Sequence, residues 1–254
     1  MEGYTLEGKT ALVTGVEHAV TRATAVTLAE AGADVAVLAS RTAHEAQADA
    51  VAAAVRAYQR QSLAYAIDVT NVAIVRSTID TVVQAWGRLD ILVNGLDLPF
   101  AAPFLDNTPE DWHALFAHTL NGTLHSIHAA GRHMLTQRHG RIISYISVLA
   151  ERGVANCAAY SATQAAILQL TRALAIEWGQ YGVTLNAIGG GWMQDSLFLP
   201  RSDDELQRLQ RYIPDHQFGQ PDDLVTLATY LASDMGGNVT GQVMYIEGGV
   251  MAHP

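Results

Sequence analysis

Short, continuous runs of apolar residues alternate along the chain with longer segments whose apolar residues recur at helical spacing. The runs predict strands at Thr10–Thr14, Asp34–Ala39, Leu63–Asp68, Leu89–Asn94, Arg141–Ser147, Val183–Gly189 and Gln242–Glu247. The longer segments predict helices at Arg22–Ala31, Ala43–Gln59, Val72–Trp86, Trp112–Arg138, Ala158–Tyr181 and Pro221–Ala232. The helix at 112–138 is long, with Gly122 and Gly131 as candidate breaks, and Gly190–Pro214 is predicted to be irregular.

Strands whose apolar residues are continuous are typical of a parallel sheet that is covered on both faces. Strands that alternate with helices predict an α/β fold, here a Rossmann-type doubly wound parallel sheet of about seven strands. The chain has 254 residues and shows no internal repeat or interdomain linker. It is therefore expected to form a single domain over residues 1–254.

Composition excludes several classes of function. Apolar residues make up 49% of the chain, the formal net charge is −10, and Lys9 is the single lysine, so no basic face for nucleic acid is expected. No apolar run is long enough to cross a membrane, and the N-terminus does not resemble a secretory signal. The single cysteine, Cys157, fits a reducing compartment, so a cytoplasmic location is expected.

Several short motifs follow one another in a fixed order. They are Thr14-Gly15, Asp68-Val69-Thr70, Gly87 through Asn94, Gly140 through Ile143, Ser147 and Tyr160 with twelve residues between them, Phe218 through Asp222, Tyr230 through Asp234, and Thr240 through Gln242. In this order they resemble the short-chain dehydrogenase/reductase family over nearly the whole chain. The resemblance implies a nicotinamide dinucleotide near Gly15, Asp68 and Asn94, and a catalytic Ser147 and Tyr160.

The chain departs from this family in the turn after the first strand. The family's Gly-x-x-x-Gly-x-Gly keeps Gly15 but has Ala19 and Thr21 at its later glycines. Glycines in such a turn allow the backbone to approach the pyrophosphate. A β-branched Thr21 is expected to hinder that approach, and would be strained if its φ were positive. A slightly rebuilt turn that still binds a dinucleotide is the alternative.

The end of the second strand bears on the choice of cofactor. It reads Ser40-Arg41, without the acidic residue that would hold the ribose hydroxyl of NAD. Arg41 could instead receive a 2′-phosphate, or be an ordinary exposed residue at a helix start. We therefore expect no bound cofactor, or NADP if any dinucleotide binds.

The catalytic residues implied by the resemblance are also incomplete. The family's lysine, four residues after the tyrosine, is Gln164, and its proton-relaying asparagine falls at Thr119. Tyrosine has a pKa of about 10, and a cation roughly 4 Å away would lower it by about 3 units, which glutamine cannot do. The family's Asn-Asn-Ala-Gly reads Asn94 through Asp97, which places a carboxylate beside the expected nicotinamide pocket, and its Pro-Gly reads Gly190-Gly191.

Other reactive residues favour structural roles. The histidines at 113, 118, 125, 128, 133 and 139 lack cysteine or carboxylate partners at matching spacing, so no metal site is predicted. Asp195 is expected to be a solvated loop carboxylate, with contact to substrate as the alternative. Cys157 is expected to be a small packing residue rather than a nucleophile.

Three functions are consistent with these residues. The first is a cofactor-impaired subunit that assembles with an active relative in an alcohol or β-hydroxyacyl-thioester dehydrogenase, as the family's heteromeric members do. The second is an atypical NADP-dependent oxidoreductase in which neutral Tyr160 is the acid, Ser147 orients the substrate and Gln164 contacts the ribose. The third is a non-redox enzyme resembling halohydrin dehalogenases, which carry arginine where this chain has Gln164. In the first, a homo- or hetero-oligomer forms through the two long helices, the last helix and strand, and the tail at Val250–Pro254.

Overall fold

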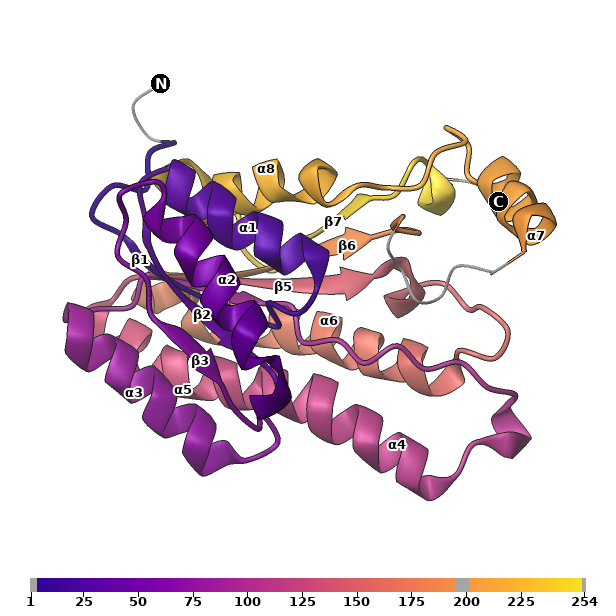
Figure 1. The fold of residues 1–254 in the computed structure, drawn as a ribbon, viewed down its shortest axis with the longest axis horizontal. Coiled ribbons are helices and arrows are strands. Elements are labelled where there is room, and N and C mark those ends of the chain that lie inside the picture. Colours follow the sequence, from indigo (N-terminus) through magenta and orange to yellow (C-terminus); the bar gives the residue numbers. More distant parts are fainter. Residues whose placement is uncertain (1–3, 195–201, 253–254) are drawn as a thin grey trace.

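Seven parallel strands form one sheet in the computed structural model, which describes residues 4–194 and 202–252 (Figure 1). The strands are β1 (Thr10–Thr14), β2 (Asp34–Ala39), β3 (Ala64–Ala66), β4 (Ile91–Asn94), β5 (Gly140–Ser147), β6 (Val183–Gly190) and β7 (Val243–Ile246). Their order across the sheet is β3-β2-β1-β4-β5-β6-β7. The predicted doubly wound α/β fold is therefore confirmed.

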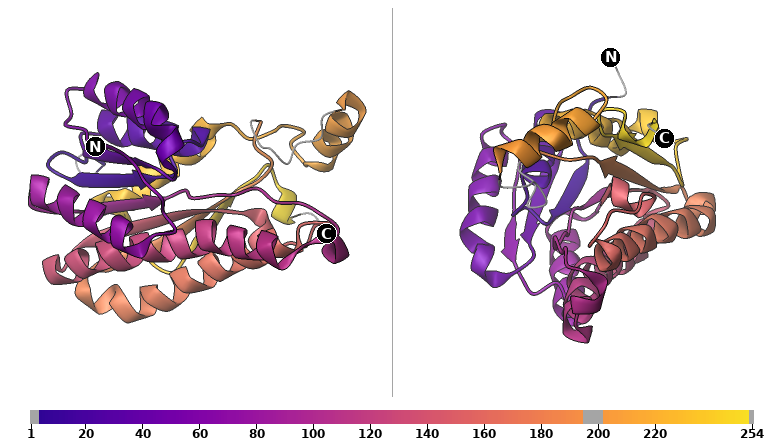
Figure 2. Two further views of the ribbon diagram at one scale, coloured as in Figure 1. Left: turned by 60° about the horizontal axis from the view of Figure 1, so that its bottom comes forward. Right: turned by 90° about the vertical axis from the view of Figure 1, so that its right-hand side faces the viewer.

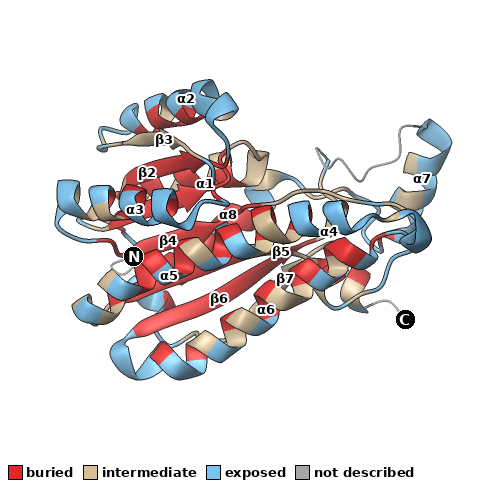
Figure 3. Cartoon of the chain, turned by 90° about the horizontal axis from the view of Figure 1, so that it is seen from below, coloured by how far each residue is buried: buried red, intermediate tan, exposed pale blue. Residues whose placement is uncertain are grey.

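Helices cover both faces of this sheet. They are α1 (Ala19–Glu30), α2 (Glu45–Arg56), α3 (Val72–Trp86), α4 (Pro109–Leu115), α5 (Gly122–Gln137), α6 (Ala158–Trp178), α7 (Asp203–Tyr212) and α8 (Pro221–Ala232). One layer contains α1, α2 and α8, and the opposite layer contains α3, α5 and α6 (Figures 1 and 2). Successive residues of β1 point to opposite layers, since Ala11 and Val13 pack in the first core and Leu12 in the second. The central strands are consequently buried on both faces (Figure 3).

The strand order reverses between β1 and β4, which are hydrogen-bonded neighbours. Open α/β sheets place ligands outside the carboxyl ends of their strands at such a switch point. The loops after these two strands touch there. Gly15 has a φ of +76°, and a Cβ added to it would lie 2.3 Å from the carbonyl oxygen of Gly95. Glycine at position 15 therefore allows the two loops to pack against each other at the switch point.

The predicted long helix at 112–138 is two helices in the structure. Between α4 and α5 the segment Phe116–Asn121 forms a π-helix, whose extra residue per turn changes the direction in which the following side chains point. The change falls at Gly122, one of the two predicted break points. Gly131 is not a break: it lies within α5, where a Cβ would come 2.5 Å from the Trp178 ring.

The segment predicted to be irregular, Gly190–Pro214, contains the helix α7. Ser202 caps this helix by accepting a hydrogen bond from the Glu205 amide at 3.4 Å, and acidic residues fill its first turn. This capping pattern can be recognised in the sequence. Acidic residues near the N-terminus of a helix stabilise the helix. None of its residues is buried, which explains why an argument from apolar periodicity overlooked it. Among the described residues no helix is long and apolar enough to cross a membrane.

Candidate functional site

A cavity of about 370 Å³ lies at the carboxyl ends of β1, β4, β5 and β6. The predicted residues that line it are Ala19, Thr21, Ser147, Tyr160 and Gln164. The other predicted site residues do not line it; these are Gly15, Arg41, Asp68, Asn94 and Thr119. The structure thus brings Ser147, Tyr160 and Gln164 together, and separates them from Thr119 and from most of the residues implied to bind the cofactor.

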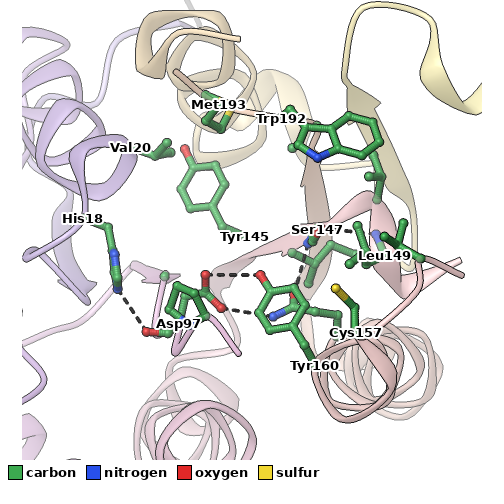
Figure 4. Close-up of a pocket in the computed structure, with 18 of the residues that line it drawn as sticks. His18, Val20, Asp97, Tyr145, Ser147, Leu149, Cys157, Tyr160, Trp192 and Met193 are labelled. Carbon is green, nitrogen blue, oxygen red and sulfur yellow. Dashed lines mark hydrogen bonds between the residues drawn. The ribbon is translucent and has the colours of Figure 1, made fainter. Parts of the chain in front are cut away.

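Asp97 occupies the centre of the polar end of this cavity (Figure 4). Its Oδ2 accepts a hydrogen bond from the Tyr160 hydroxyl at 3.2 Å, and its Oδ1 accepts one from the Gln164 Nε2 at 3.3 Å. The Gln164 Oε1 in turn accepts from the Ser147 amide at 3.0 Å. Gln164 therefore uses both ends of its amide to join the loop after β4 to the end of β5.

The protonation of this group differs from what an active tyrosine requires. Burial raises the pKa of Tyr160 well above its usual value, and the neighbouring Asp97 raises it further. Burial also raises the pKa of Asp97. A buried tyrosine beside a carboxylate keeps its proton, because ionising it would place two negative charges side by side. Tyr160 is therefore neutral near pH 7 and cannot serve as a base there.

The turn after β1 does not carry the strain that the sequence suggested. Neither Ala19 nor Thr21 has a positive φ, because α1 starts at Ala19, three residues earlier than predicted. The Thr21 hydroxyl donates to the carbonyl oxygens of Gly15 at 2.5 Å and His18 at 3.0 Å. Its methyl group points toward Gly95: a Cβ on Gly95 would lie 2.0 Å from the Thr21 Cγ2. Thr21 fits this turn because residue 95 has no side chain.

This close contact predicts a strong coupling between residues 21 and 95. We expect Gly95→Ala to reduce the free energy of unfolding by roughly 1–3 kcal/mol, the usual cost of overpacking. In a chain that also carries Thr21→Gly the same change should cost at least about 1 kcal/mol less, because the colliding methyl group is gone. Urea unfolding of the four chains of this cycle measures the coupling. Additive effects would contradict the contact.

A second carboxylate, that of Glu17, binds to Ser40, the residue that directly follows β2. It accepts hydrogen bonds from the Ser40 amide at 3.2 Å and from the Ser40 hydroxyl. His118 Nε2 donates to that hydroxyl oxygen at 2.9 Å, since the Ser40 proton is engaged by Glu17. Burial, helped by the nearby Arg41 charge, lowers the pKa of His118 to about 4, so the ring is neutral at pH 7.

The predicted residues outside the cavity have separate environments. Arg41 is exposed, and the exposed Asp68 caps its own loop by accepting from the Thr70 amide and hydroxyl at 2.9 and 2.7 Å, which lowers its pKa. Asn94 and Thr119 are buried, and their side-chain polar atoms have no hydrogen-bond partners among the described residues.

The remaining reactive residues are dispersed. His133 bonds to Asp80 at 2.7 Å, His125 to the carbonyl oxygen of Val69 at 3.1 Å, and His113 is exposed. Within residues 4–194 and 202–252, no group of three or more histidine, cysteine, aspartate or glutamate side chains could hold a metal ion. Cys157 is buried in a small apolar cluster and also borders the cavity. Asp195 lies outside the described residues.

Sequence reasoning missed Tyr145, which lines the cavity, and Glu17, which bonds to Ser40 at the neighbouring end of β2. Tyr145 lines the cavity, and its hydroxyl bonds to the Thr24 hydroxyl at 2.7 Å. Alternation along β5 could have revealed it, because residues two apart share a face and Tyr145 precedes Ser147 by two. Glu17 was missed because an acidic residue was sought after the second strand and not within the first turn.

Comparisons with known proteins agree with this architecture. A family profile described as enoyl-(acyl carrier protein) reductase matches residues 15–251. The BbsD subunit of (2S)-[(R)-hydroxy(phenyl)methyl]succinyl-CoA dehydrogenase from Thauera aromatica is 32% identical over 247 residues, covering 96% of this chain and 97% of that protein. The 3-oxoacyl-[acyl-carrier-protein] reductase FabG of Staphylococcus aureus is 32% identical over 242 residues, covering 95% of this chain and 98% of that protein.

Solved structures give the same result. A gluconate 5-dehydrogenase from Burkholderia cenocepacia in complex with NADP and tartrate superposes with a TM-score of 0.93 at 31% identity, covering 100% of this chain and 99% of that one. An NAD+-bound xylitol dehydrogenase superposes with a TM-score of 0.88 at 28% identity, covering 96% and 99%. The chain therefore belongs to the short-chain dehydrogenase/reductase family of oxidoreductases.

Proposed function

We propose that this chain is a subunit impaired in dinucleotide binding, which assembles with a catalytically complete relative in a dehydrogenase of hydroxyacyl thioesters. The observation that carries the proposal is the Asp97 carboxylate, hydrogen-bonded to both Tyr160 and Gln164. In relatives that use a nicotinamide cofactor, the family resemblance implies a glycine at position 97 and a lysine at position 164. The side chain at 97 takes up space beside the expected ribose, and the cation that would hold the ribose is absent.

The residues of this chain do not fit a dinucleotide. A buried carboxylate near an anionic pyrophosphate is unfavourable, because like charges in a low-dielectric site repel strongly. The Glu17 carboxylate adds a second negative charge where the sequence suggested that Arg41 could hold a 2′-phosphate. A neutral Tyr160 could still donate a proton, but the atypical NADP-dependent reductase would need both carboxylates to move. These observations favour an impaired subunit over that alternative.

The partner proposed here follows from a relative's description. The Thauera aromatica protein is named as one subunit of a dehydrogenase that acts on a hydroxylated succinyl-CoA thioester. This chain is similar to that subunit over nearly its full length but has an altered catalytic group. It therefore suits the role of the second, inactive subunit in such an assembly. Ser147 and Tyr160 would then retain a binding or packing role.

Isothermal titration calorimetry with NAD and NADP tests the impaired site, using protein purified alone and from its native host. We expect dissociation constants weaker than about 100 μM for both nucleotides. Native mass spectrometry of the host preparation should show a second chain of similar mass. Binding at a few micromolar, or a homomer that oxidises hydroxyacyl thioesters by itself, would refute the proposal.

The structure changes which residue should probe the subunit contact. Leu168, which the sequence offered as a contact residue, is only 3% exposed and packs in the chain's own core. Leu224 and Leu231 on α8 are likewise internal. On α6 the apolar side chain left in solvent is Ile176, at 86% exposure. Because the family resemblance implies that subunits pair through this helix, Ile176 is the exposed side chain on it that can probe the contact.

We expect Ile176→Glu to shift the assembly toward monomers, because a charge in an apolar interface is left desolvated. Light scattering at micromolar concentration measures the change in mass. The matched control is Val72→Glu, which alters an exposed aliphatic residue (54%) at the start of α3 and should leave the mass unchanged. Wild-type protein that is monomeric at this concentration would contradict the assembly.

A further inference from the structure

Asp97 is a buried carboxyl group whose side chain has no ion-pair partner within the described part of the chain. His18, the basic side chain beside it, bonds to the Asp97 backbone carbonyl oxygen at 3.2 Å and not to the carboxylate (Figure 4). Burial raises the pKa of Asp97, whereas the electrostatic effect of His18 and the hydrogen bond from Tyr160 lower it. A carboxylate withdrawn from solvent without a counter-charge is costly to keep.

Much of the wall of the cavity that this carboxylate faces is apolar or aromatic. Its walls include Val20, Tyr145, Leu149, Trp192 and Met193. Figure 4 shows the Tyr145 ring beside the Asp97–Tyr160 pair, with Trp192 farther along the same cavity. Aromatic faces attract cations, and the attraction is larger where water is excluded. A volume of about 370 Å³ is at the small end of the range for ligand pockets.

We propose that this cavity binds a small hydrophobic amine, whose ammonium group pairs with Asp97 and whose apolar body lies against Tyr145 and Trp192. The inference rests on the proposed function, because the amine would occupy space that a dinucleotide would otherwise need. A site with this composition would prefer cationic ligands, whereas the family's site holds an anionic dinucleotide. Relative to the glycine and lysine implied by the family resemblance, Asp97 and Gln164 together make the site more negative by two charges.

The geometry restricts the ligand's class. An anionic ligand would meet the carboxylate without a compensating cation, so carboxylates and phosphates are disfavoured. A neutral alcohol of the same shape would keep the apolar contacts and one hydrogen bond, but would leave the Asp97 charge unpaired. The amine alone satisfies both the apolar wall and the carboxylate.

Calorimetry of the wild-type chain with three ligands of one shape tests this selectivity. The ligands are 2-phenylethylamine, 2-phenylethanol and phenylacetate, at neutral pH and moderate salt. We expect the amine to bind about tenfold tighter than the alcohol, a difference of about 1.4 kcal/mol, and phenylacetate to bind weakest. Equal binding of amine and alcohol, or tightest binding of phenylacetate, would overturn the proposal without any variant being made.

Two variants locate the effect. Asp97→Asn keeps the size of the side chain and should abolish the preference for the amine over the alcohol. Asp49→Asn makes the same chemical change on the exposed surface of α2 and should preserve it. If Asp97→Asn keeps the tenfold preference, the ammonium does not pair with Asp97.

A titration with NADP separates the two proposals. Micromolar binding of NADP would refute the impaired dinucleotide site, whether or not the amine binds.

Discussion

A chain carrying Gln164→Lys alone is expected to remain inactive with NADPH on ketone and β-ketoacyl substrates. The new ammonium group would lie within reach of the Asp97 carboxylate, which already bonds to residue 164. The two would form a buried ion pair, so the cation would neutralise Asp97 and would not be available to a ribose. The carboxylate would still fill the space beside it. Initial rates of NADPH oxidation measure the outcome.

Removing the Asp97 carboxylate as well should allow the site to bind NADPH. We expect Asp97→Gly with Gln164→Lys to bind NADPH roughly 100-fold tighter than Gln164→Lys alone. Without the carboxylate, the introduced ammonium group is free to attract the ligand's phosphates, and opposite charges about 4 Å apart gain about 4 kcal/mol at an effective dielectric near 20, a figure that screening reduces. The pKa of Tyr160 should also fall, because an adjacent anion is exchanged for a cation. Calorimetry of the paired variants, with Asp49→Asn plus Gln164→Lys as control, tests this expectation.

Robust turnover by Gln164→Lys alone would show that Asp97 does not obstruct the cofactor. No gain in the double variant would have a different meaning. It would place the obstruction at the Glu17–Ser40 contact or at Thr21, which the double variant leaves intact. Adding Glu17→Gln to that variant separates these causes, since the amide keeps its size but loses its charge.

Wild-type protein is expected to lose stability steeply as the pH falls from about 6.5 to about 4. Burial lowers the pKa of His118 from 6.5 to about 4 in the folded chain. Between these values the unfolded chain binds a proton at this ring that the folded chain does not, so the free energy of unfolding rises with pH. The stabilisation is present above pH 6.5 and is lost as the pH falls toward 4. A shift of this size corresponds to about 3 kcal/mol.

Urea unfolding at several pH values isolates this contribution. His118→Gln keeps an N–H donor for the Ser40 hydroxyl and removes the titration, so its stability should change less over this range by about 3 kcal/mol. His113→Gln alters an exposed histidine and should follow the wild-type curve. Parallel curves for wild type and His118→Gln would mean that this ring is solvated in the native protein.

Several features of the chain could be predicted from local pattern alone. Continuous apolar runs such as Asp34–Ala39 predicted buried parallel strands because both faces of the sheet are covered. The family resemblance, carried by short motifs, implied a catalytic Ser147 and Tyr160, and both line the cavity. Polar, exposed elements such as α7 escaped this reasoning, since its sequence has capping signals but no buried face.

The contacts that decide the chemistry of the site join residues far apart in sequence. The sequence alone determined the order of the elements, the family, and the identity of the altered residues at 19, 21, 97 and 164. It could not show that Asp97 would bond to Tyr160, that Thr21 would fit against Gly95, or that Glu17 would reach Ser40. Periodicity says which face of an element a side chain occupies, but a hydrogen bond depends on the packing of separate loops to within fractions of an ångström. Only the tertiary structure fixes that packing.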